Sequence, residues 1–163
     1  MIFVTVGMSD YSFVRLIREM DRIAASINER AIMQIGNTSY NPQNTEFFRF
    51  GSPQKIEQYI RDSKLVVSHC GVGTIVLLLK LGKPLILVPR MKKYGESIDD
   101  HQIEIAKELE NRGIAVSYEI DDLEVLLQTS DIRSVYISMD KDKVLTLALK
   151  EYLDRLKTSK GVP

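Results

Sequence analysis

The sequence contains one cysteine, no excess of either charge and no apolar run long enough to cross a membrane. Cys70 has no second cysteine with which to form an internal disulfide, and the start MIFVTVG lacks the charged and long apolar regions of a signal peptide. Both features favour a cytoplasmic protein. The longest uncharged apolar run, 71–79, has about half of the roughly 20 residues that a membrane-spanning helix needs.

The charge balance argues against nucleic acid as a partner. The chain has 22 basic and 22 acidic residues, so no overall field would draw it onto a polyanion. Its 163 residues, 44% hydrophobic and 27% charged, are typical of a soluble globular protein with one core. We therefore expect residues 1–163 to form a single domain.

Short apolar runs alternate with amphipathic segments along the chain. Strands are predicted at 2–6, 31–35, 47–50, 65–68, 85–88 and 114–117, and helices at 13–27, 54–61, 73–81 and from about 103 to Gly113. The predicted helix caps are Ser12 or Asp10, Ser52 before Pro53, and Asp99 or Ser97. This order predicts an α/β fold with a Rossmann-like, mainly parallel sheet, helices on both faces, and ligands bound beyond the carboxyl ends of the strands.

A glycine-containing turn, SHCGVGT at 68–74, joins the fourth predicted strand to the next helix. Gly71 and Gly73 let the backbone approach a ligand closely, and the unpaired amides of a helix start attract an anion. Thr74 adds a hydroxyl donor. The turn therefore predicts a phosphate or pyrophosphate site, with glycine used for packing alone as the alternative.

Other familiar sites are disfavoured. The segment GVGTIV lacks the third glycine of the dinucleotide fingerprint, and no lysine followed by serine or threonine closes a P-loop. His69, His101 and Cys70 have no CxxC or HxxxH spacing, so no metal is expected. The local signatures of Ser-His-Asp and Cys-His hydrolases are also missing.

A second polar cluster, YGESIDDHQ at 94–102, follows the strand at 85–88 and should face the same edge of the sheet. Helix capping explains Asp99 and Asp100. Capping does not require His101 or Gln102, which offer hydrogen bonds suited to sugar hydroxyls.

Three of these segments, SHCGVGT, GKPLILVPR and DDHQIEIAKELENRG, together resemble the donor-binding C-terminal domain of glycosyltransferase family 28, the C-terminal half of a GT-B enzyme. MIFVTVG, FVRLI and QIGNTSYNP are similar to the small stand-alone members of that family, which are subunits of two-part transferases. The resemblance covers roughly residues 1–117.

The resemblance implies a set of donor-binding residues. They are Gly7, Ser9, His69, Gly71, Gly73, Thr74, His101 and Gln102. Two loops would contact the donor pyrophosphate: one contains Gly7 and Ser9, and the other contains Gly71, Gly73 and Thr74, with His69 beside it. His101 and Gln102 would contact the donor sugar, and Asp99 is also a possible donor-binding residue. Phe50, beside Gly51, would form the wall near the base. No metal or cofactor is implied, because the UDP-sugar is a substrate.

One position departs from the family pattern. Family members commonly carry a glutamate three residues after the threonine, where it holds the ribose hydroxyls, and this chain has Leu77 there. Glu96 is one candidate replacement. Weaker donor binding, or loss of donor binding, are the other interpretations.

The resemblance implies the donor-binding subunit of an inverting glycosyltransferase, moving a sugar from a UDP-sugar to a lipid-linked saccharide acceptor in polysaccharide biosynthesis. A membrane-anchored partner would supply the catalytic base and acceptor site and recruit this cytoplasmic chain to the cytoplasmic face of the membrane. An amphipathic C-terminal helix, 142–157, would help to join the subunits. The alternatives are a noncatalytic enhancer subunit, which Leu77 favours, and a nucleotide-dependent oxidoreductase, against which the incomplete dinucleotide fingerprint argues.

Overall fold

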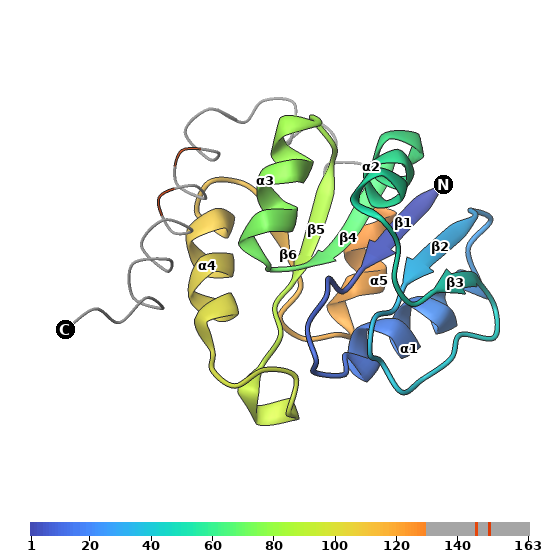
Figure 1. Cartoon of the computed structure of the whole chain (residues 1–163), viewed down its shortest axis with the longest axis horizontal. Coiled ribbons are helices and arrows are strands. Elements are labelled where there is room, and N and C mark those ends of the chain that lie inside the picture. Colours follow the sequence, from blue (N-terminus) through green and yellow to red (C-terminus); the bar gives the residue numbers. More distant parts are fainter. Residues whose placement is uncertain (130–145, 147–149, 151–163) are drawn as a thin grey trace.

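Six short strands pair in parallel in the computed structural model, which describes residues 1–129, 146 and 150 (Figure 1). The strands are β1 (Ile2–Thr5), β2 (Ala31–Gln34), β3 (Glu46–Phe48), β4 (Leu65–His69), β5 (Leu85–Val88) and β6 (Ala115–Val116). The helices are α1 (Val14–Ala24), α2 (Pro53–Asp62), α3 (Val72–Lys80), α4 (His101–Glu110) and α5 (Asp122–Gln128), with a 3-10 turn η1 (Lys92–Tyr94). The predicted α/β sheet with helices on both faces is confirmed.

Each face of the sheet carries its own apolar core, since successive strand residues point to opposite faces. On one face Phe3 of β1 packs in a cluster with residues of α2, α3 and α4, such as Ile75 and Ala106. On the other face Val4 packs in a cluster with residues of α1 and α5, such as Leu16 and Leu123. Because the central strands are buried on both faces, their sequences are mostly apolar, with polar residues only at the carboxyl ends of β1 and β4.

The strand order β3-β2-β1-β4-β5-β6 puts β1 and β4 side by side in the middle of the sheet. From β1 the chain crosses through α1 to β2 on one side, and from β4 it crosses through α3 to β5 on the other (Figure 1). The loops after β1 and β4 therefore run in opposite directions from the carboxyl edge of the sheet. In doubly wound sheets this switch point is where ligands bind.

The helix ends test the predicted caps. Ser52 caps α2 as predicted, since its Oγ accepts a hydrogen bond from Lys55 N at 3.3 Å. The prediction for α1 is wrong, because Phe13 holds the N-cap position and its amide donates to Thr38 Oγ1 instead. Asp100 is the N-cap of α4, and Asp99 Oδ1 accepts from His101 N at 3.1 Å.

Two further features bear on the predicted organisation. Helix α5 was missed because its 7 residues span too few turns for a clear periodicity. The predicted helix at 142–157 lies outside the described residues except for positions 146 and 150, so it stays a prediction. In the part of the chain that the structure describes, no helix combines the length and apolar character needed to cross a membrane.

Candidate functional site

The His69 ring lies between two glycines at the switch point of the sheet. A Cβ built on Gly71 would be 2.1 Å from His69 Nε2, and one built on Gly7 would be 2.5 Å from His69 Cε1. Gly7 also has a φ of +72°, which residues with a side chain rarely adopt. Both glycines therefore pack closely against the ring. For Gly71 this is the alternative that the sequence left open for the turn at 68–74.

The loop after β1 is held by the buried side chain of Gln34, at the end of β2. Its Oε1 accepts hydrogen bonds from Thr5 Oγ1 at 2.7 Å and from Gly7 N at 3.1 Å. Its Nε2 donates to Gly7 O at 2.9 Å and to Arg49 O at 2.8 Å. The Gly7 amide is thus already used inside the protein. The sequence analysis did not identify Gln34 as a site residue, although the QIGNTSYNP motif contains it.

Helix α3 starts directly after the second glycine turn. Its N-cap is Gly71, no side chain caps it, and its first turn contains no acidic residue. The first amides of the helix point along its axis toward the carboxyl edge of the sheet, where they can bind an anion. A Cβ on Gly73 would meet nothing within 4 Å, and Gly73 itself is exposed. Unlike Gly71, Gly73 is therefore not required for packing.

A pocket of about 340 Å³ opens beside this helix start. Its lining includes Gly7 and Met8 after β1, Phe50 and Gly51 before α2, and Thr74 and Leu77 on α3. A volume of this size is at the small end of ligand sites in proteins. The structure thus brings together four predicted positions, Gly7, Phe50, Thr74 and the divergent Leu77, in one cavity at the switch point.

Helix α2 and the two strands β1 and β2 complete the lining. Helix α2 contributes Pro53, Ile56 and Glu57, and the strands contribute Thr5 and Gln34. Since Gln34 and Thr5 bond to each other and to the loop after β1, their polar atoms are largely engaged. The pocket is mostly apolar with few polar groups, which is typical of a site that binds an organic ligand with a polar end.

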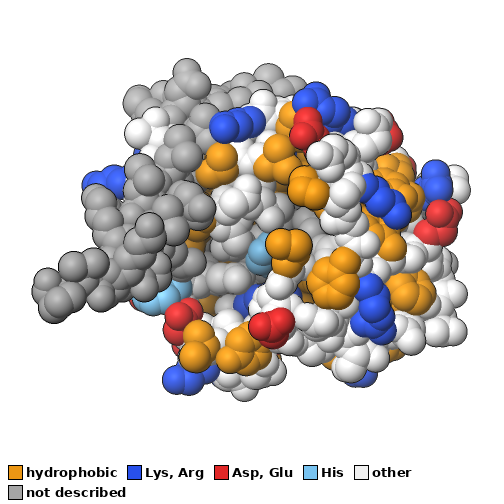
Figure 2. All heavy atoms as spheres, in the orientation of Figure 1, with side chains coloured by type: hydrophobic (Ala, Val, Ile, Leu, Met, Phe, Trp, Pro, Cys, Tyr) orange, Lys and Arg blue, Asp and Glu red, His pale blue; other side chains and the backbone are white. Residues whose placement is uncertain are grey.

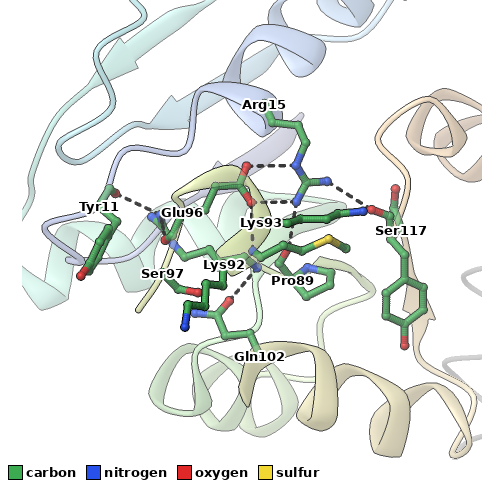
Figure 3. A network of polar contacts seen from close by, with 12 residues as sticks. Tyr11, Arg15, Pro89, Lys92, Lys93, Glu96, Ser97, Gln102 and Ser117 are labelled. Atoms are coloured by element: carbon green, nitrogen blue, oxygen red, sulfur yellow. Dashed lines mark hydrogen bonds and ion pairs between the residues drawn. The ribbon is translucent and has the colours of Figure 1, made fainter. Parts of the chain in front are cut away.

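Glu96 is not among the residues that line this pocket. It is 3% exposed and forms a two-pronged ion pair with Arg15 of α1, with both N–O distances at 3.0 Å (Figure 3). Its Oε2 also accepts a hydrogen bond from Met91 N at 3.1 Å. The expectation that Glu96 replaces the missing ribose glutamate is therefore wrong, because its carboxylate is committed to joining the loop after β5 to α1.

Arg90, which follows β5, is a second buried arginine that holds loops at the carboxyl edge. Its Nη1 donates to Tyr11 O and Glu96 O, and its Nη2 donates to Val6 O at 3.0 Å. Its guanidinium also lies 4.5 Å from the centre of the Phe13 ring. Arg90 thereby ties the loop after β1 to the loop after β5, a role that the sequence analysis missed.

Burial changes the pKa values of these groups. Burial, together with the charge of Arg90, holds the pKa of His69 at about 4, so its ring is neutral at physiological pH. Burial lowers the pKa of Arg90 to about 10, which leaves it charged. Burial raises the pKa of the Cys70 thiol, in agreement with its prediction as a small buried side chain rather than a reactive one.

The predicted pair His101 and Gln102 lies at the start of α4 and outside the pocket lining. His101 is exposed, with Nδ1 3.1 Å from Glu104 Oε2. Gln102 Oε1 accepts from Cys70 N and Arg90 N, both at 3.1 Å, so it joins the ends of β4 and β5. Gln102 is thus engaged in part by the backbone, while the His101 ring faces solvent.

Ser9, the last predicted position, lies in the loop between β1 and α1. Its Oγ accepts a hydrogen bond from Tyr11 N at 3.2 Å, and its carbonyl accepts one from Asn37 Nδ2 at 3.1 Å. These bonds shape the loop from within. Ser9 is therefore close to the pocket along the chain but is not part of its lining.

Exposed apolar side chains occur on the loops that follow the strands. Met8 is 82% exposed, Phe50 50%, Tyr94 47% and Ile98 72%. Figure 2 shows hydrophobic side chains on this face of the molecule, around a hollow in the surface. Met8 and Phe50 also line the pocket, whereas Tyr94 and Ile98 lie between β5 and α4 and are not part of its lining. Exposed apolar side chains beside a cavity are typical of a surface that another domain or subunit covers.

Comparisons with known proteins agree with this geometry. The family model described as the glycosyltransferase family 28 C-terminal domain matches residues 1–155. The UDP-N-acetylglucosamine transferase subunit ALG13 of Candida albicans is 32% identical over 92 residues, which are 56% of this chain and 30% of that protein. ALG13 of Homo sapiens is 31% identical over 121 residues, which are 69% of this chain and 10% of that protein. The chain thus matches less than a third of the length of either relative.

Solved structures share the fold. The calicheamicin glycosyltransferase CalG4 has a TM-score of 0.60 at 15% identity, covering 99% of this chain and 43% of that chain. The solution structure of ALG13 has a TM-score of 0.54 at 21% identity, covering 79% of this chain and 84% of that chain. MurG of Acinetobacter baumannii has a TM-score of 0.56 at 15% identity, covering 91% of this chain and 49% of that chain.

Proposed function

Because this chain belongs to the glycosyltransferase family 28 C-terminal domain family, we propose that it is the donor-binding subunit of a glycosyltransferase that uses a UDP-sugar. The observation that carries the proposal is the pocket at the switch point, which adjoins the uncapped start of α3. The helix start suits a pyrophosphate, and the apolar part of the pocket around Phe50 suits a base.

The pocket supports a specific contribution to catalysis. In an inverting transfer, an acceptor oxygen attacks the anomeric carbon, the bond from that carbon to the phosphate oxygen breaks, and the acceptor proton passes to a base. Negative charge then develops on the departing UDP. Amides at the start of α3 and the Thr74 hydroxyl would stabilise that charge and lower the barrier. The remaining site residues orient the loops that surround the nucleotide.

The proposal assigns the base and the acceptor site to a partner. The ALG13 relatives are named as transferase subunits, which supports an enzyme made of more than one chain. The exposed apolar side chains of Met8 and Phe50, which line the pocket, also favour a covering partner. We propose that this partner is membrane-anchored, that the acceptor is a lipid-linked saccharide in polysaccharide biosynthesis, and that the cytoplasmic chain is recruited to the membrane face. The chain by itself should show negligible transfer, and robust turnover without a partner would refute this division.

A noncatalytic enhancer subunit is the second candidate. It is favoured by Leu77, because a leucine in the pocket lining offers no hydrogen bond to a nucleotide. An enhancer would bind the partner without binding a donor. The two candidates therefore differ in whether the chain binds UDP.

Calorimetric titration of the chain with UDP, UDP-sugars, GDP and NADPH tests the proposal. We expect UDP-selective binding that Gly73→Asp abolishes, because a carboxylate at the exposed start of α3 would repel the pyrophosphate without disturbing any packed neighbour. Asn28→Asp is the matched control, since it adds the same charge at an exposed position next to the opposite edge of the sheet. Binding of UDP that survives Gly73→Asp would refute the phosphate site, and failure of UDP to bind would favour the enhancer.

A further inference from the structure

We infer that Glu57, on α2, is the residue that recognises the ribose hydroxyls of the bound nucleotide, an inference that rests on the proposed function. Glu57 is half-buried and lines the pocket together with Phe50 and Leu77. Among the described residues of the lining it is the one that carries a charge. A ribose presents two neighbouring hydroxyl donors, and an ionised carboxylate is the side chain that accepts hydrogen bonds without donating any.

The other polar side chains of the lining are less suited to this role. Gln34 uses its Oε1 for Thr5 Oγ1, Val6 N and Gly7 N, and its Nε2 for two backbone carbonyls. Thr74 lies one turn before Leu77 on α3, at the end of the helix where phosphate is expected. A hydroxyl that lies beside Leu77 therefore finds its strong acceptor on α2 and not on α3.

The surroundings of Glu57 hold its carboxylate in place and leave one oxygen available. Arg61, one turn later, donates to Glu57 Oε1 from Nε at 3.0 Å and from Nη2 at 2.6 Å. Within the described part of the chain, Glu57 Oε2 accepts no hydrogen bond. Because one oxygen is anchored by a guanidinium, the side chain is oriented before the ligand arrives, which reduces the entropy lost on binding.

With Glu57 in the pocket, Leu77 no longer implies that the chain has lost ribose binding. A leucine at the position of a ribose-binding glutamate would leave the sugar hydroxyls without an acceptor if the rest of the pocket were apolar. With Glu57 in the same lining, the acceptor comes from the neighbouring helix. The chain then binds a nucleotide through a carboxylate that lies before the glycine turn in the sequence, rather than after it.

Titration of the full chain with UDP and 2′-deoxy-UDP tests the inference. A hydrogen bond to a charged group contributes enough that UDP should bind roughly tenfold more tightly than 2′-deoxy-UDP, and Glu57→Ala should remove that preference. Glu108→Ala is the matched control, because it truncates the same residue type in another pair with an arginine four positions later. Glu108 is on α4 and outside the pocket lining, and its Oε1 is 2.9 Å from Nη2 of Arg112, which follows that helix. The control should keep the tenfold preference.

The outcomes separate the inference from the function on which it rests. Failure of the unaltered chain to bind UDP would remove the proposed function. Binding of UDP with no preference over 2′-deoxy-UDP, or a preference that Glu57→Ala leaves intact, would overturn the role of Glu57 and leave donor binding standing. Thermal unfolding of both variants identifies any loss of fold, and Glu57→Gln, which preserves the shape of the side chain, replaces Glu57→Ala if the latter is unstable.

Discussion

Replacing Gly71 with alanine should destabilise the protein through one contact. The φ of Gly71 is −81°, which alanine adopts freely, so the backbone itself does not oppose the change. The new Cβ would lie 2.1 Å from His69 Nε2 and 2.8 Å from His69 Cδ2, where ordinary contacts begin at 3.4 Å. The His69 ring is buried and has Gly7 against it, so it cannot withdraw freely.

The size of the effect follows from two opposing contributions. Forcing an extra methyl group into a packed site costs about 1–3 kcal/mol. Replacing glycine by alanine restricts the unfolded chain, which stabilises the folded state by about 0.4–1 kcal/mol. We therefore expect Gly71→Ala to lower the free energy of unfolding by about 1.3 kcal/mol, the difference between the midpoints of these two ranges.

Urea unfolding of a double-mutant cycle measures this contact. In a His69→Ala background the ring is gone, so adding Gly71→Ala should cost little or be slightly stabilising. Gly73→Ala is the matched control in the same turn, because its Cβ would meet nothing within 4 Å, and it should not destabilise the protein. A Gly71→Ala protein as stable as the original, or a loss of stability that persists without the ring, would refute the reasoning.

Two further predictions concern buried charge. Because the pKa of His69 is about 4 in the folded protein and ordinarily 6.5, the unfolded chain takes up this proton first, and lowering the pH from about 6.5 to about 4 should remove up to about 3 kcal/mol of stability. His69→Asn should lose that part of the pH dependence in urea titrations, and an unchanged dependence would contradict the assignment. Glu96→Gln should cost about 3 kcal/mol of unfolding free energy by leaving Arg15 buried without a counter-charge, yet leave UDP affinity within about twofold. Loss of UDP affinity in a folded Glu96→Gln protein would return Glu96 to the binding site, and Glu119→Gln, which breaks an exposed pair at 3.7 Å, is the control.

Local sequence patterns were enough to predict most of the fold. Continuous apolar runs such as 85–88 mark strands buried on both faces, and the apolar positions of α1 recur at helical spacing. The cap at Ser52 and the glycine turn before α3 are also local signals, since both depend on residues a few positions apart. Short elements without such signals, such as α5, were missed.

The contacts that build the site could not be predicted in the same way. Gln34 reaches Gly7 across 27 positions, and Arg90 reaches Val6 across 84. Glu96 was predicted as a possible ligand-binding residue, but its carboxylate pairs with Arg15, 81 positions away. None of these pairs has a periodicity or a spacing rule, because each depends on which strands are neighbours in the sheet.

The sequence by itself determined the alternation of strands and helices, the family resemblance and the position of the glycine turn before α3, because these depend on hydrophobic spacing and on motifs of adjacent residues. The tertiary structure decided which polar groups are free to meet a ligand. It assigns Gly7 and Gly71 to packing around His69, engages Glu96 and in part Gln102 inside the protein, and brings Glu57 of α2 into the pocket lined by Leu77 of α3. The physical reason is that a buried polar group must find a partner, and that partner is set by the packing of distant segments.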